Sequence, residues 1–156
     1  MKNILLTYIL IFIFLTSCGF KIVNQSEQIN FDIAEITSSG DKRINYAIRG
    51  KLLSFSKKNE EKLINIRLNS NKNKIVKEKN IKNEITKYQI DIIIKVEFEE
   101  VGKSETYQLD LSKSGDFDVS NRYSQTLENE KKLTKLLTND ITDDLLNLLI
   151  NKLNEL

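Results

Sequence analysis

The sequence predicts an α+β fold in which two helices pack on one face of a mostly antiparallel sheet of about four strands. Two periodicities carry this prediction. Apolar residues occupy every second position in several segments, as in half-buried strands, and every third or fourth position in two others, as in amphipathic helices. The segments follow in the order strand, helix, strands, helix within 156 residues, a length that suits one domain.

The first strand and the first helix are expected between residues 29 and 57. Alternating apolar positions predict the strand, which ends in a turn at Gly40; they are Ile29, Phe31 and Ile33. Asp41 then caps a helix whose apolar face repeats at helical spacing. That face consists of Ile44, Ala47, Ile48, Leu52 and Phe55.

The second strand is expected at 64–68, where Ile64, Ile66 and Leu68 alternate with polar residues. The next segment, 69–73, is rich in asparagine and is interpreted as a turn. Residues 74–81 are interpreted as a strand or an exposed hairpin arm.

The strand prediction is clearest at 88–98. Six apolar residues occupy every second position, namely Tyr88, Ile90, Ile92, Ile94, Val96 and Phe98. This pattern indicates a half-buried antiparallel strand, and we expect Ile90, Ile92, Ile94 and Val96 in the core. A hairpin turn at 101–104 leads to another strand from Tyr107, which continues less regularly beyond Gly115.

The last segment returns to helical spacing, from about Asn129 to Leu156. Its stripe consists of Leu133, Leu136, Leu137, Ile141, Leu145, Leu148, Leu149 and Lys152. Such a broad apolar stripe predicts a helix that lies on the sheet.

The N-terminus is expected to be a targeting segment and not part of the fold. A basic start and a short apolar run, too short to span a membrane, are typical of a secretory signal peptide. The run ends in Leu15-Thr16-Ser17-Cys18-Gly19, which resembles a bacterial lipobox. We therefore expect residues 1–17 to be removed, Cys18 to be lipidated, residues 18–28 to form a tether, and residues 29–156 to form the domain. Gly19 is compatible with the outer membrane.

Composition argues against several classes of function. The formal net charge is +2, which does not favour a nucleic-acid binder. The chain has no histidine and a single cysteine, so the usual general base is absent and no cysteine-rich zinc site can form. The adjacent carboxylates, such as Asp143 and Asp144, are interpreted as solvated charge. We therefore expect no enzyme, no metal and no cofactor.

Charge is unevenly distributed along the chain. Residues 41–82 contain 13 basic and 4 acidic residues, whereas 83–156 contain 9 basic and 15 acidic residues. The basic excess is densest around Lys72, Lys74, Lys77 and Lys79. A spacing of two places each pair on one face of an extended segment. Two hypotheses fit such lysines: they form an anion-binding surface, or they lie on an edge strand and prevent its aggregation with other sheets.

The order of elements resembles the lipopolysaccharide-assembly lipoprotein family LptE. The resemblance covers nearly all of residues 18–154. It includes Cys18-Gly19-Phe20 at the start, Tyr88 entering the long central strand, and an aromatic residue followed by an acidic stretch before the last helix. Phe117, Tyr123 and Glu128-Asn129-Glu130 match that last feature. The Leu-Arg-Gly that often follows the family's start is Ile22-Val23-Asn24 here.

The resemblance implies an outer-membrane lipoprotein on the periplasmic side. It would plug the large β-barrel LptD and assist its assembly, for transport of lipopolysaccharide and its insertion into the outer leaflet. Lys77 or Lys79 lies nearest to the family's lipopolysaccharide-contacting basic residue, and Lys72 and Lys74 extend the same candidate site. The alternative is an accessory or lipid-binding lipoprotein of a phospholipid transport system, which would require an apolar cavity.

Overall fold

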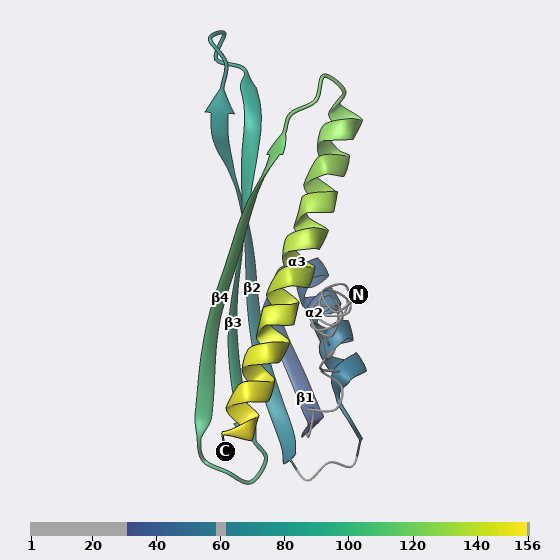
Figure 1. The fold of residues 1–156 in the computed structure, drawn as a ribbon, viewed down its shortest axis with the longest axis vertical. Coiled ribbons are helices and arrows are strands. Elements are labelled where there is room, and N and C mark those ends of the chain that lie inside the picture. Colours follow the sequence, from purple (N-terminus) through teal and green to yellow (C-terminus); the bar gives the residue numbers. More distant parts are fainter. Residues whose placement is uncertain (1–30, 59–61, 156) are drawn as a thin grey trace, which may run out of the picture.

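The computed structural model describes residues 31–58 and 62–155, so the signal peptide, Cys18 and the tether lie outside the described residues. The element order is β1 (Phe31–Gly40), α2 (Lys42–Phe55), β2 (Lys62–Lys79), β3 (Ile85–Glu100), β4 (Thr106–Asp118) and α3 (Tyr123–Asn154). Figure 1 shows an elongated domain in which α3 runs along much of the length of the sheet. The predicted α+β fold and its element order are confirmed.

The four strands form one sheet in the order β1-β2-β3-β4. β2 pairs with β3 and β3 with β4 in antiparallel fashion, whereas β1 and β2 are parallel. Parallel neighbours need a crossover, and α2 supplies it between β1 and β2. The sheet is therefore mostly antiparallel, as predicted, with one parallel pair at its edge.

The turn from β1 into α2 is fixed by a glycine and a helix cap. Gly40 has φ +93°, and a Cβ at this position would lie 1.9 Å from the carbonyl oxygen of Ser70 on β2. The Asp41 carboxylate accepts hydrogen bonds from the backbone N–H groups of Arg43 and Ile44, at 2.9 and 3.1 Å. The helix start predicted at Asp41 is thus confirmed.

A small buried polar network holds the start of α2 against the sheet. The Ser70 hydroxyl lies 2.7 Å from the Asn45 side-chain oxygen, and the Asn45 amide donates to the Ser39 carbonyl at 2.8 Å. Because both Asn45 and Ser70 are buried, their pairing avoids the cost of unsatisfied polar groups.

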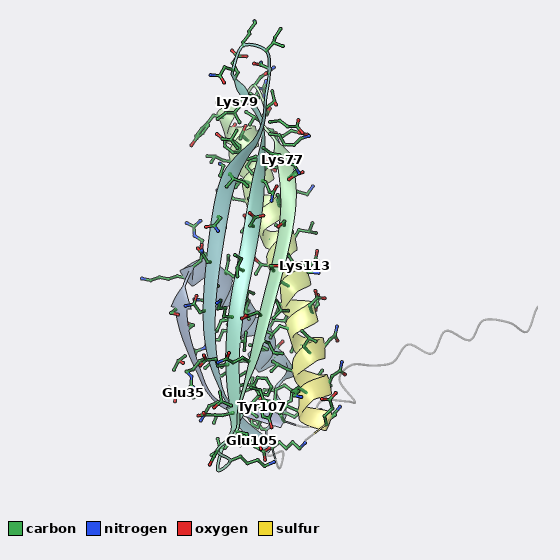
Figure 2. All side chains as sticks on the ribbon, turned by 90° about the vertical axis from the view of Figure 1, so that its left-hand side faces the viewer. Glu35, Lys77, Lys79, Glu105, Tyr107 and Lys113 are labelled. Carbon is green, nitrogen blue, oxygen red and sulfur yellow. The ribbon has the colours of Figure 1, made fainter. Side chains whose placement is uncertain are left out.

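One face of the sheet forms the hydrophobic core. Ile90, Ile92, Ile94 and Val96 are all buried, which confirms the core predicted for β3. The adjacent Ile93 points to the other face and is 37% exposed. α2 and α3 cover the core face, and Figure 2 shows the sheet in front of α3.

The C-terminal helix differs from its prediction in two respects. It begins at Tyr123, six residues before the predicted start near Asn129. Two members of the predicted stripe, Leu136 and Leu148, are 56% and 42% exposed. Thr138 and Thr142 are buried in their place, and each hydroxyl donates to a carbonyl one turn earlier on α3. These bonds allow polar threonines to share the buried face.

The predicted turn at 69–73 is wrong, because β2 runs without interruption through this segment. Asn69 and Ser70 pair with β1 on one side, and residues 69–73 pair with β3 on the other. Pairing with β1 stops at Ser70. Beyond that residue β2 is an edge strand, as the hairpin-arm interpretation of 74–81 anticipated.

Candidate functional site

The long hairpin formed by residues 71–93 is the candidate site, and we call it the arm. It contains the part of β2 that lacks a β1 neighbour and the part of β3 paired with it. Its tip is the upper end of the molecule in Figure 1. All four lysines predicted as a glycolipid-binding site, Lys72, Lys74, Lys77 and Lys79, lie on this arm.

Lys72 and Lys74 lie on the helix-facing side of the arm and share one carboxylate. Their ammonium groups lie 3.2 and 2.6 Å from the two carboxylate oxygens of Glu130 on α3. The Glu130 side chain is only 18% exposed. Burial raises the pKa of Glu130, but the hydrogen bonds and charges of Lys74 and Lys72 outweigh it, and the pKa lies below its ordinary value.

Two aromatic rings complete this cluster. The Lys74 ammonium lies 4.2 Å from the ring centre of Tyr88 and 5.2 Å from that of Phe117. The two rings are stacked with their centres 5.6 Å apart. Lys74 therefore joins α3 to β3 and β4 through one ion pair and two cation–π contacts.

Lys77 lies on the opposite face of the arm. It forms an ion pair with Asp116 of β4, and its charge also reaches Asp91. The pKa of Asp91 is lowered by hydrogen bonds from Gln89 and Ser114 and, more weakly, by Lys77. The four predicted lysines thus do not form one continuous ladder, because two face α3 and one faces away.

The tip of the arm is a well-bonded turn. The Asn80 side-chain oxygen accepts hydrogen bonds from the backbone N–H groups of Lys82 and Glu84, at 2.9 and 3.0 Å. Asn83 adopts φ 63°, a left-handed conformation that asparagine tolerates well. This turn presents Ile81 fully exposed to solvent, beside Lys82.

Lys79 and Lys82 differ from the other arm lysines because neither has an ion pair among the described residues. Lys79 donates to the Asn83 side-chain oxygen at 3.1 Å. An exposed apolar side chain between lysines suits an amphipathic partner, since long cationic side chains can follow apolar surface while keeping their charge in water.

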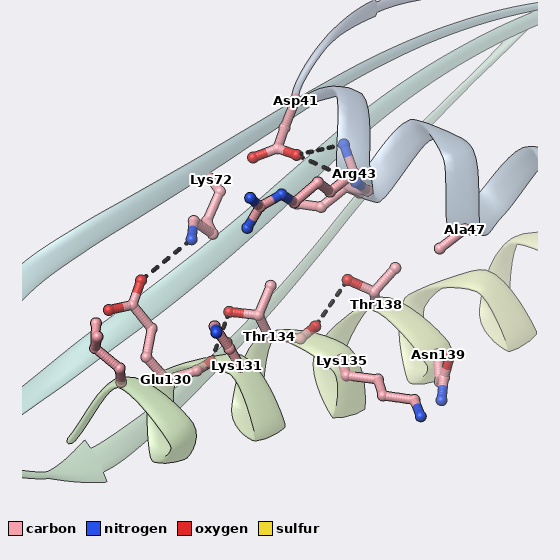
Figure 3. A pocket seen from close by; sticks show the side chains of 12 residues that line it. Asp41, Arg43, Ala47, Lys72, Glu130, Lys131, Thr134, Lys135, Thr138 and Asn139 are labelled. Atoms are coloured by element: carbon pink, nitrogen blue, oxygen red, sulfur yellow. Dashed lines mark hydrogen bonds and ion pairs between the residues drawn. The ribbon is translucent and has the colours of Figure 1, made fainter. Parts of the chain in front are cut away.

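A second feature is a groove between α2 and α3, with a volume of about 410 Å³. Figure 3 shows side chains of both helices lining it, including Arg43 from α2 and Lys131 and Lys135 from α3. Lys72 and Glu130 close one part of the groove, so it adjoins the arm.

The sheet face opposite the helices is polar and bears paired charges. Arg67 lies 3.1 Å from Glu97 and 3.7 Å from Glu99. Within the described ranges, 31–58 and 62–155, no group of three or more metal-binding side chains occurs. None of the helices in these ranges has the length and apolar character needed to cross a bilayer.

Sequence reasoning missed Glu130 as the partner of two candidate lysines. It lies 56 residues beyond Lys74, so no local spacing reveals the contact. The acidic stretch Glu128-Asn129-Glu130 was the available signal, but nothing in it indicates which strand it faces.

Two solved structures of similar fold are described as lipoproteins. Rare lipoprotein B from Shewanella oneidensis aligns with a TM-score of 0.50 at 11% identity, over 78% of this chain and 94% of that one. A protein from Caulobacter crescentus described as a lipoprotein aligns with a TM-score of 0.52 at 10% identity, over 84% and 95%. No protein-family model and no curated protein matches the sequence. The chain therefore has the fold of these two lipoproteins.

Proposed function

We propose that this chain is an outer-membrane lipoprotein, anchored through Cys18 on the periplasmic side. It plugs an LptD-like β-barrel, assists its assembly, and so takes part in the insertion of lipopolysaccharide into the outer leaflet. The observation that carries the proposal is the fold shared with rare lipoprotein B, a protein of the LptE family. The role requires no catalytic residue and no cofactor.

The two faces of the sheet suit a plug. The core face is closed by α2 and α3, so the domain can keep its shape without its partner. The opposite face carries alternating polar and charged side chains, such as Arg67, Lys95 and Glu97. The interior of a large membrane barrel is also polar, so this face can contact it without placing charged side chains against apolar surface.

The arm suits contact with an anionic glycolipid or with the barrel wall. Lys79 and Lys82 have no ion pair among the described residues, and Ile81 lies exposed beside them. Lys72 and Lys74 form ion pairs with Glu130, and Lys77 forms one with Asp116, so the net positive charge around these three lysines is smaller. We therefore place the glycolipid contact toward the tip of the arm.

The test is purification of the tagged, full-length, lipidated protein from membranes in a mild detergent. We expect a large β-barrel to co-purify in stoichiometric amount. Cys18→Ala should reduce its yield, because the lipid anchor raises the effective concentration of the domain beside the barrel. Recovery of the protein with phospholipid and no barrel would favour the phospholipid-transport alternative, and recovery alone would contradict both.

A further inference from the structure

The groove between α2 and α3 combines an apolar lining with cations that have no ion pair within the described part of the chain. Ile44 and Ala47 of α2 and Leu127 of α3 contribute apolar side chains. Thr134 and Thr138 also line it, and their hydroxyls donate to the carbonyls of Glu130 and Thr134 on α3. Because these hydroxyls already have partners, the two threonines need no further hydrogen bond from a ligand.

The charge around this lining is positive. Arg43, Lys131 and Lys135 line the groove, and none of them has an ion pair among residues 31–58 and 62–155. The acidic residues present are already engaged. Asp41 accepts two backbone N–H groups of α2, and Glu130 is paired with Lys72 and Lys74.

We propose that this groove binds one acyl chain of a lipid with a phosphate headgroup. The chain lies along Ile44, Ala47 and Leu127, and the phosphate meets Arg43, Lys131 and Lys135. The volume of about 410 Å³ is within the range of small-molecule sites and suits a single chain. Charge complementarity selects the occupant. Three cations with no ion pair among the described residues, beside apolar surface, favour an anionic amphiphile over a neutral one.

This inference goes beyond the proposed function, because it requires no barrel partner and lies apart from the tip of the arm. It also assigns a role to three cations that the sequence did not single out. A chain held here would lie beside Glu130 and Lys72, at the root of the arm.

The experiment uses the full-length lipidated protein in a neutral maltoside detergent, with a photoreactive benzophenone amino acid replacing Ala47. Ala47 is exposed on α2 and lines the groove, so the replacement should leave the core intact. Radiolabelled dodecyl phosphate is the probe. The matched control carries the same amino acid at Ser54, which is also exposed on α2 but does not line the groove.

We expect capture of the probe at position 47 to exceed that at position 54 by about tenfold. Combining Arg43→Gln, Lys131→Gln and Lys135→Gln should reduce capture at 47 by about tenfold, since each exposed ion pair contributes modestly. A control triple that removes the same charge elsewhere, Lys57→Gln, Lys95→Gln and Lys132→Gln, should leave capture unchanged. Thermal melts of all variants distinguish lost binding from lost folding.

Equal capture at positions 47 and 54 would overturn the site. Capture at 47 that survives the groove triple, or that octyl maltoside and octyl phosphate displace equally well, would overturn the anionic occupant. An unfolded groove triple would be replaced by Lys131→Gln alone, for which we expect about a threefold loss of capture. Full capture by that folded single variant would contradict the proposed phosphate contact. None of these results depends on whether a barrel co-purifies.

Discussion

The two ends of the sheet are built on different principles. At the base, where β1 pairs with β2, four strands and both helices surround fully buried side chains such as Ile66, Ile94 and Phe98. In the arm, β2 and β3 extend past β1, with β4 still paired to β3, and the ion pairs of Lys72 and Lys74 with Glu130 join β2 to α3. The base therefore supplies stability through apolar burial, and the arm keeps charged and apolar groups accessible at modest energetic cost.

The largest expected effect is at the base. Ile94→Asp would place a charge at a position with no exposed surface, and we expect it to lower the free energy of unfolding by at least about 4 kcal/mol. Ile93→Asp is the matched control on the opposite face of β3 and should cost within about 1 kcal/mol. Urea denaturation of both variants measures the contrast. Equal losses would mean that the two faces of β3 are not distinguished as described.

The junction between β1 and α2 should be nearly as sensitive. Gly40→Ala would strain a positive φ and place a methyl group against the Ser70 carbonyl, at a cost of about 3 kcal/mol. Gly50→Ala, inside α2 and with open space around it, should instead stabilise the protein by about 0.5–1 kcal/mol. Thermal melts should shift in opposite directions. A neutral Gly40→Ala would show that the junction tolerates a different backbone path.

The ion-pair cluster of the arm should contribute less and should depend on pH. The pKa of Glu130 in the folded protein lies below its ordinary value of 4.5, so its contribution is present above that pH and is lost as the pH falls through the folded pKa. Glu130→Gln should therefore cost about 1 kcal/mol at neutral pH, and the difference from wild type should shrink under acidic conditions. A difference that stays constant across this range would exclude the carboxylate charge as its cause.

The smallest expected effect on stability is at the tip of the arm, where the effect on binding should be visible. Lys79→Gln with Lys82→Gln removes two cations without ion pairs among the described residues, so the melting temperature should hardly change. Binding of lipopolysaccharide should fall about threefold and should depend on salt. Lys72→Gln with Lys74→Gln should lower the melting temperature more and lipopolysaccharide binding less, because it leaves Glu130 without these two ion pairs. Aggregation of the tip variant with unchanged binding would identify the lysines as edge protection.

Sequence reasoning succeeded where periodicity reports burial directly. The alternation through Ile90, Ile92 and Ile94 predicted both the strand and its buried face, and Asp41 predicted the start of α2. It failed at 69–73, because asparagine-rich sequence favours turns locally whereas pairing with β1 and β3 holds this segment extended. The early start of α3 was missed because Arg122 provides no side-chain cap and the first turn is polar.

The candidate site was less accessible to prediction than the fold. Lys72 and Lys74 were selected by their spacing, but their shared partner Glu130 is set by how α3 lies on the sheet. Lys77 lies on the other side of the arm because it is three residues beyond Lys74, and side chains alternate between the two faces of a strand. The spacing therefore predicts that Lys74 and Lys77 point to opposite faces, but it does not predict which face meets α3.

The most direct test of the account is to ask which end of the molecule meets its partner in intact cells. A photoreactive benzophenone amino acid is introduced at Ile81, at the tip of the arm, or at Leu63, which is 37% exposed at the base. We expect Ile81 to be crosslinked to lipopolysaccharide and Leu63 to give markedly less of this adduct. A lipopolysaccharide adduct at Leu63 with none at Ile81 would contradict the assignment of the arm as the element that contacts the glycolipid.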